Sequence, residues 1–263
     1  MRSCTARASQ RQRARERAIV RSVGGLVERG PFELGEGARV RRARPADLDA
    51  VLTIRRGVAL PSDPRQRGDS FLLGSEAEGY ASLLDARRMW LLEREDQPVG
   101  FTVTLSDALL RETPLWRERA RIEWHAGERD PNQLEGGTAY FDQLAVLPAR
   151  RQRRWSACLA LCALAELVAD EAHARVWITT VLEPVVNRAA LPYLSHLGAR
   201  EIGRLDEHYP EVGAIVSALH AVEAQGYWSY AAALAGRSRP SIEAVLAGVA
   251  RAAEARDALL LNP

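Results

Sequence analysis

Hydrophobic and polar positions follow two different periods along the middle of the chain. Short apolar runs of strand length alternate with stretches in which apolar residues recur every three or four positions. The first pattern is typical of β-strands and the second of helices. We therefore predict strands at 40–43, 89–93, 99–105, 140–147 and 176–181, and helices at 45–56, 75–85 and 156–172.

The segment from 140 to 181 is the most informative of these. It reads as a strand, a tight turn, a buried helix and a second strand, which predicts a right-handed crossover between parallel neighbours. The turn brings free N–H groups and the positive end of a helix dipole together, which suits a phosphate group. Guanidinium groups around the turn add to this attraction. A charged surface turn that binds nothing is the alternative. The arginines concerned are Arg150, Arg151, Arg153 and Arg154.

Residues 107–138 form a long insertion between predicted strands. Such long connections are usually functional lids or disordered segments. Apolar side chains including Leu110, Trp116 and Ile122 favour a folded, lid-like insertion that shapes a pocket.

The two ends of the chain differ from its middle. The first 21 residues hold seven arginines and one glutamate, a net charge of +6, which leaves −4 for the rest. Attachment to nucleic acid or anionic lipid, or a transit peptide, would fit this composition. No aromatic residues are interspersed to stack on bases, so we favour a solvated, flexible extension over residues 1–38. A helical extension is expected over 221–263, with its aromatic cluster (Tyr227, Trp228, Tyr230) used for core or dimer packing.

Composition narrows the class of protein further. With 263 residues, 47% of them hydrophobic and 27% charged, the chain reads as a globular protein. Its longest apolar stretch, 157–165, is too short for a membrane span. The chain has three cysteines, Cys4, Cys158 and Cys162, and so small and uneven a number argues against a disulfide framework. No histidine lies beside Cys158 and Cys162, so they make a poor zinc site. We expect reduced thiols, no metal and a cytoplasmic location.

The residues around the predicted crossover resemble a known family. Residues 141–148 (FDQLAVLP), with the arginine turn and buried helix that follow, resemble the acetyl-CoA motif of the GNAT N-acetyltransferase superfamily. Asn187, Ala190, Leu197 and Gly198 resemble its second cofactor motif. The resemblance covers about residues 38–206. It implies a mixed α+β fold of the α/β class, with a GNAT-like domain over 39–220 whose central mixed sheet is flanked by helices.

The resemblance also implies where the donor, acetyl-CoA, would bind. Two strands would splay apart, and the pantetheine arm would lie in the gap along the backbone of Leu144, Ala145 and Val146. Asn187 would hold the pantetheine side. Arg154 and Ser156 stand where the family has small residues, so Arg154 either blocks the phosphates or contacts them. The implied diphosphate cradle consists of Arg151, Gln152, Arg153, Arg154, Trp155, Ser156 and Ala157.

The implied reaction is direct transfer of an acetyl group to a primary amine. Family members often protonate the departing thiolate with a tyrosine, and Tyr193 lies one position before the expected place. Pro192 lies inside the helix that the second motif implies, and a proline is tolerated there only if the helix begins late or kinks. Asp142, Glu123 and His125 are candidates for the base that removes the amine proton. The acceptor is a small molecule or a protein, and a homodimer is possible.

Two other functions stay open at this point. A GNAT-like module with a degenerate cofactor loop would bind acyl-CoA without turnover. A nucleic-acid-associated protein would use the arginine tail, but the net charge of −4 on the rest of the chain argues against this function.

Overall fold

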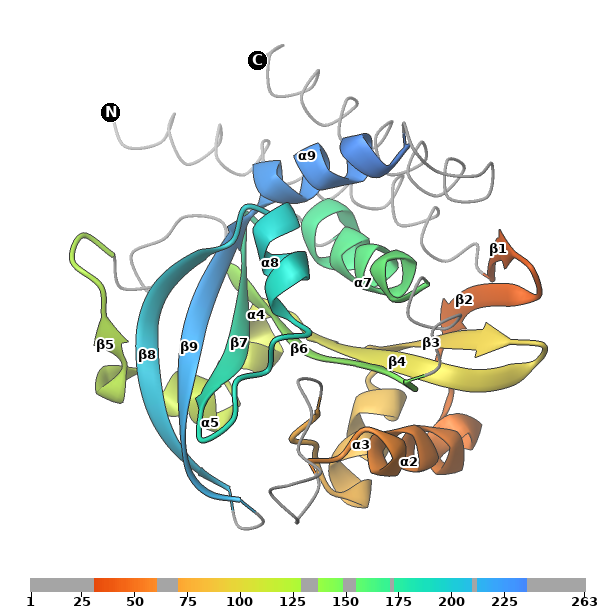
Figure 1. Cartoon of the computed structure of the whole chain (residues 1–263), viewed down its shortest axis with the longest axis horizontal. Helices are drawn as coiled ribbons and strands as arrows, with labels where there is room; N and C mark the ends of the chain where they lie inside the picture. Colours follow the sequence, from red (N-terminus) through yellow and green to blue (C-terminus); the bar gives the residue numbers. More distant parts are fainter. Residues whose placement is uncertain are drawn as a thin grey trace, which may run out of the picture.

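The computed structural model describes residues 31–60, 71–128, 137–148, 155–170, 173–209 and 212–235 (Figure 1). The arginine turn at 149–154 and residues 236–263 of the expected helical extension lie outside the described residues. Among the described residues, no helix has both the length and the apolar character required to cross a membrane.

A single mixed sheet forms the centre of the molecule. Its strand order is β1-β2-β3-β4-β6-β7-β9-β8-β5, and all neighbours are antiparallel except β6 and β7, which are parallel as the sequence predicted. The fold class expected from the sequence is therefore confirmed. The strands are β1 (Phe32–Gly35), β2 (Ala38–Arg42), β3 (Met89–Arg94), β4 (Gln97–Leu105), β5 (Glu123–Trp124), β6 (Thr138–Val146), β7 (Arg175–Glu183), β8 (Arg200–Tyr209) and β9 (Gly213–Glu223).

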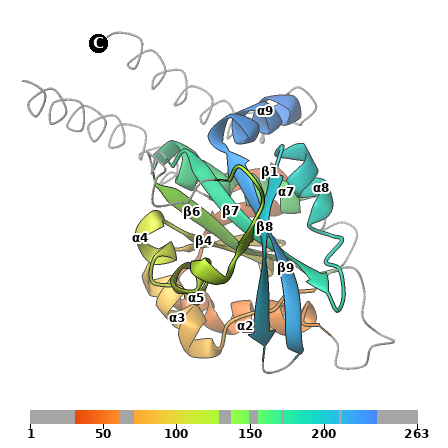
Figure 2. The same ribbon diagram turned by 90° about the vertical axis from the view of Figure 1, so that its left-hand side faces the viewer.

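Helices cover both faces of this sheet. One apolar core lies between the sheet and α7, with Tyr227 of α9 and Leu197 beside it. The other lies between the opposite face and α2, α3, α4 and α5 (Figures 1 and 2). The helices are α2 (Leu48–Gly57), α3 (Ala77–Asp85), α4 (Asp107–Leu110), α5 (Pro114–Arg117), α7 (Ser156–Ala165), α8 (Leu191–His196) and α9 (Ala224–Ala235), with 3-10 turns at Pro45–Asp47 and Arg119–Arg121.

Strand β1 begins before the expected boundary between residues 38 and 39. It pairs with β2 across a turn in which Gly35, Glu36 and Gly37 have positive φ, and it buries Leu34 against the core. Glycine tolerates that backbone conformation without strain. Residues 32–38 thus belong to the sheet and not to an N-terminal extension.

The expected helix 156–172 changes its winding near its end. After Ala165 it continues as a π-helical turn over Glu166–Asp170. The Glu166 carboxylate is buried there and accepts hydrogen bonds from Arg42 Nη1 at 2.7 Å and Trp90 Nε1 at 3.1 Å. A buried charge needs such partners, and this one ties α7 to β2 and β3.

The described part of the insertion, 107–128, is folded onto the sheet. Leu110, Trp116 and Ile122 are buried, as their apolar character suggested, and β5 pairs with the outer edge of β8.

Gly100 on β4 allows β6 to approach closely. A Cβ atom at this position would lie 2.8 Å from the Ala145 carbonyl oxygen and 2.9 Å from Val146 Cγ2. We expect Gly100→Ala to lower the free energy of unfolding by about 1–3 kcal/mol, because overpacking a close backbone contact forces the strands apart. Urea denaturation monitored by circular dichroism measures this, and unchanged stability would show that the contact yields easily.

Candidate functional site

A β-bulge in β6 places Asp142 differently from its neighbours. Gln143 pairs with Val103 of β4, and Phe141 pairs with the next β4 residue, Thr104. Asp142 is therefore an extra residue of β6 with no pairing partner on β4. A bulge leaves its extra residue outside the regular alternation of faces and can aim its side chain at a site. Asp142 lines a cavity at this point of the strand.

The cavity lies where β6 and β7 separate. Residues Thr138–Tyr140 of β6 pair with Arg175–Trp177 of β7, and no further pair joins the two strands in the described residues. Beyond these pairs lies a cavity of about 300 Å³. This is the splayed parallel pair that the family resemblance implied. Leu144 and Val146 line the cavity with other apolar residues, and its polar lining consists of Asp142, Gln143, Ser156, Thr179, Asn187 and Tyr193.

The carboxyl group of Asp142 has an unusual electrostatic environment. Its pKa is raised to about 6, mainly by burial and to a smaller extent by the charge of Glu207, while hydrogen bonds from Gln143 and Tyr140 oppose the change. Asp142 makes no salt bridge with the described basic residues. A carboxyl group with such a pKa exchanges its proton near neutral pH, as a general base must.

Tyr140 and Thr179 close the apex of the gap next to Asp142. Their hydroxyl groups are 2.6 Å apart, one on β6 and one on β7. Burial raises the pKa of the Tyr140 hydroxyl well above its ordinary value, so this group stays protonated.

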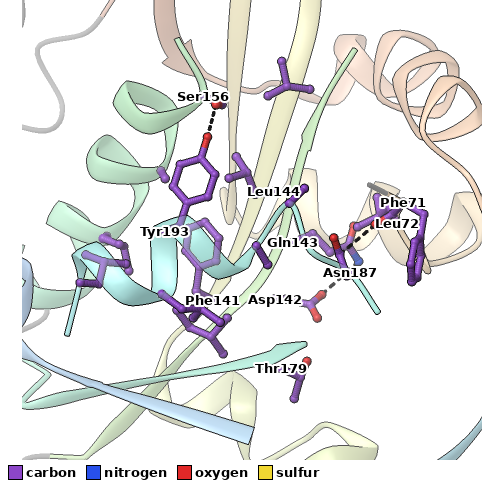
Figure 3. A pocket seen from close by; sticks show the side chains of 18 residues that line it. Phe71, Leu72, Phe141, Asp142, Gln143, Leu144, Ser156, Thr179, Asn187 and Tyr193 are labelled. Atoms are coloured by element: carbon purple, nitrogen blue, oxygen red, sulfur yellow. Dashed lines mark hydrogen bonds between the residues drawn. The ribbon is translucent and has the colours of Figure 1, made fainter. Parts of the chain in front are cut away.

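Tyr193 lies in the cavity because α8 starts late. Pro192 occupies the first turn of a helix that begins at Leu191, where its missing N–H costs nothing. The Tyr193 hydroxyl hydrogen-bonds to Ser156 Oγ at the first position of α7 (Figure 3). Gly198, at φ 63°, ends α8 in the left-handed conformation that helix ends favour.

In the turn before α8, only one of the two polar side-chain atoms of Asn187 has a hydrogen-bond partner among the described residues. Its Nδ2 donates to the Phe71 carbonyl oxygen at 3.1 Å, and its Oδ1 is buried with no hydrogen-bond partner in the described part of the protein (Figure 3). A buried acceptor of this kind is costly unless a donor reaches it. Since Asn187 lines the cavity, a ligand N–H in the cavity could satisfy it.

Other expected site residues lie elsewhere or outside the described chain. Glu123 is on β5 at the sheet edge, and His125 Nε2 lies 3.4 Å from Glu201 Oε1, so neither lines the cavity. Trp155 is buried beside α7, and Ala157 does not line the cavity. Ala145 contributes strand backbone, with its side chain buried on the opposite face. Arg151, Gln152, Arg153 and Arg154 lie outside the described residues.

The structure also adds residues to the site that the sequence did not single out. Thr179 sits on β7 opposite the Tyr140 hydroxyl, and Phe71 and Leu72 form a wall of the cavity. Thr179 lies within the strand predicted at 176–181, but its residue type alone does not mark it as part of a site. No local pattern marks Phe71, which reaches the site through a contact with residue 187. Among the described residues, no three His, Cys, Asp or Glu side chains are grouped to hold a metal ion.

The two helix cysteines should be unreactive in the folded protein. Cys158 and Cys162 are buried in α7, and burial raises the pKa of the Cys158 thiol to about 11 and that of Cys162 further. We expect iodoacetamide at pH 8 to leave both unmodified in native protein and to alkylate both in urea, because only the thiolate reacts. Peptide mass mapping reads each site separately, and rapid native alkylation of Cys158 would contradict this placement.

Known proteins resemble the chain in structure but not in sequence. No protein-family model matches the chain, and a search of curated proteins finds no match. Solved structures do resemble it. The loading GNATL domain of CurA from Lyngbya majuscula has 14% identity and a TM-score of 0.49, covering 72% of this chain and 98% of that one.

Two further structures are similar to the same degree. Arabidopsis thaliana NAA60 in complex with acetyl-CoA has 15% identity and a TM-score of 0.49, covering 71% of this chain and 99% of that one. The GphF GNAT-like decarboxylase in complex with isobutyryl-CoA has 20% identity and a TM-score of 0.48, with the same coverage. With its single parallel pair splayed around a cavity, the chain has the mixed α+β architecture that the sequence resemblance implied.

Proposed function

We propose that the protein is an N-acyltransferase that moves an acetyl group from acetyl-CoA to a primary amine by direct attack. The observation that supports this proposal is the gap between β6 and β7. One cavity at this gap contains both the unsatisfied acceptor Asn187 Oδ1 and the carboxyl group of Asp142, the bulge residue of β6. A narrow apolar cavity with a few directed polar groups is typical of a small-molecule site.

The residues present fit the pantetheine arm of the donor. Beyond Tyr140, the β7-facing edge of β6 has no strand partner in the described residues, so its backbone can pair with an extended amide chain. Asn187 Oδ1 would accept from a pantetheine N–H. Leu144 and Val146 supply apolar walls for its methylene groups.

The diphosphate would lie at the N-terminus of α7. Ser156 opens this helix, whose free N–H groups and dipole favour anions. We propose that the arginine turn, 151–154, completes this cradle, with Trp155 and Ala157 as its flanking backbone.

Asp142 is the proposed base of the reaction. As the acceptor nitrogen forms a bond to the acetyl carbon and the carbon–sulfur bond breaks, Asp142 takes up the proton that the amine loses. Tyr193 is the proposed donor of a proton to the departing sulfur, and this requires its hydroxyl to turn away from Ser156. The thioester supplies the acyl group, and the products are the amide and the free thiol of CoA. The proton taken up by Asp142 then returns to Tyr193 through solvent, so atoms and charge balance.

Donor binding can be tested without an acceptor. We expect acetyl-CoA at about 100 times its Kd to raise the Tm by about 5 °C or more, because a ligand of the folded state stabilises it by mass action. Ala160→Trp should abolish this shift, since Ala160 lines the cavity and is 6% exposed. Asn187→Leu should weaken binding about tenfold or more, as one hydrogen bond is lost.

Differential scanning fluorimetry and isothermal titration measure both effects. Thr53→Ala, on the exposed side of α2, is a control that should bind like the wild type. Absence of any shift in the wild-type protein, with the variants indistinguishable from it, would contradict a donor site in this cavity.

Asp142→Asn should remove turnover and keep donor binding. We expect kcat/KM to fall by about a hundredfold or more, the usual contribution of a general base. In the wild type, kcat/KM should decline by about tenfold per pH unit below pH 6, because the carboxyl group with a pKa of about 6 becomes protonated there.

Thiol release from acetyl-CoA with a panel of primary amines measures this rate. The stability of Asp142→Asn at pH 8 should equal or exceed that of the wild type, because the raised pKa means that the folded state disfavours the carboxylate. Binding of acetyl-CoA with no thiol release for any amine would instead favour a binding module without turnover.

A further inference from the structure

A chain of two hydrogen bonds leads from α3 to Asp142. The Tyr80 hydroxyl donates to Gln143 Oε1 at 2.8 Å, and Gln143 Nε2 donates to Asp142 Oδ2 at 3.1 Å. Tyr80 is fully buried and Gln143 is 5% exposed, so the contact between these two side chains is shielded from water. Only Asp142, at the end of this chain, is part of the proposed chemistry.

The hydrogen bonds of this chain all run toward Asp142. The Ser75 backbone N–H donates to the Tyr80 oxygen, and the Tyr80 hydroxyl donates in turn to Gln143 Oε1. A donor at that position requires the carbonyl side of the Gln143 amide to face Tyr80. The NH₂ side must then face Asp142, because the two ends of a side-chain amide cannot both be acceptors.

We propose that Tyr80 and Gln143 are positioning residues that hold the Asp142 carboxylate in the cavity with one oxygen anchored and the other directed at the acceptor amine. This inference rests on the proposed function for the use of Asp142 as the base. Its geometry is independent of that use, because the chain of hydrogen bonds exists without any substrate.

The chain also selects the form of Asp142 that can act as a base. An amide N–H that points at a carboxyl group favours the carboxylate, which can only accept. If the amide were free to turn, its oxygen could face Asp142 and favour the protonated acid. Tyr80 prevents this from a distance, without touching the carboxyl group or the cavity.

Other groups act on Asp142 or on Tyr80 alongside this chain of hydrogen bonds. Tyr140 on β6 provides a second hydrogen bond, while Glu207 on β8 disfavours the carboxylate through its charge. Tyr209 on β8 interacts with Asp142 electrostatically, and Arg55 on α2 acts on Tyr80. The Thr179 hydroxyl on β7 is hydrogen-bonded to the Tyr140 hydroxyl.

Titration of Asp142 in full-length protein tests the proposal directly. Carbon-13 NMR of aspartate-labelled protein follows the Asp142 carboxyl signal with pH, and its absence in Asp142→Asn assigns it. We expect Tyr80→Phe to raise the Asp142 midpoint by about one pH unit, the scale of one lost hydrogen bond to a charge. No substrate is needed, so this measurement stands even if the protein transfers no acyl group.

Tyr227→Phe is the matched control. Tyr227 is fully buried like Tyr80, and its hydroxyl donates to the Leu161 carbonyl oxygen at 3.2 Å on the other side of the sheet. Both variants lose one buried hydroxyl, but only Tyr80→Phe should move the Asp142 titration. Equal midpoints in Tyr80→Phe and the wild type would overturn the proposal, as would equal shifts in the two variants.

Gln143→Met provides a second route to the same result. It removes the amide while conserving volume, so it should also raise the midpoint, and adding Tyr80→Phe to it should cause no further shift because the chain is already cut. Additive shifts would overturn the relay. In an active enzyme, the acid limb of the kcat/KM profile should move upward with the midpoint, and the plateau at high pH should change less than threefold.

Discussion

The separation of β6 and β7 after three residue pairs is the constraint on which the site depends. Two parallel strands that part inside a protein leave backbone N–H and C=O groups along the edges of the gap. Such groups are costly when buried without partners, so the gap must be either filled by side chains or open to a ligand. The cavity of about 300 Å³ beside β6 shows that side chains do not fill it.

Packing on both faces of the sheet keeps this gap in place. The apolar helix α7 presses on one face of β4 and β6, while α2, α3 and α4 cover the other. The bulge at Asp142 falls at the same level as the separation, on the edge of β6 that still pairs with β4. One strand therefore carries both the unpaired edge and the carboxyl group, which brings the proposed donor site and the proposed base within a few residues of each other.

Much of this could be predicted from the sequence because it is local. The apolar runs at 140–147, 156–172 and 176–181 indicate a parallel crossover, and the structure confirms it. The late start of α8 follows from Pro192, and the burial of the thiols from their place in an apolar helix. The motif residues Leu144, Asn187 and Tyr193 do meet in one cavity.

What could not be predicted depends on contacts between distant residues. The bulge at Asp142 is defined by the register between β6 and β4. The pairing of β1 with β2 depends on a turn that we did not predict from the residue types alone. Gln143 and Tyr80 are 63 positions apart, and Phe71 and Asn187 are 116 apart, so no spacing rule connects them. His125 and Glu123 were plausible bases by residue type, but β5 pairs with β8 at the far edge of the sheet.

Hydrogen–deuterium exchange of the amides in residues 141–146 tests the central claim most directly. If the gap receives the thioester arm as an added strand, acetyl-CoA should slow exchange in this segment of β6, and Ala160→Trp should abolish that protection. Exchange in 141–146 that is the same with and without saturating acetyl-CoA would contradict the account.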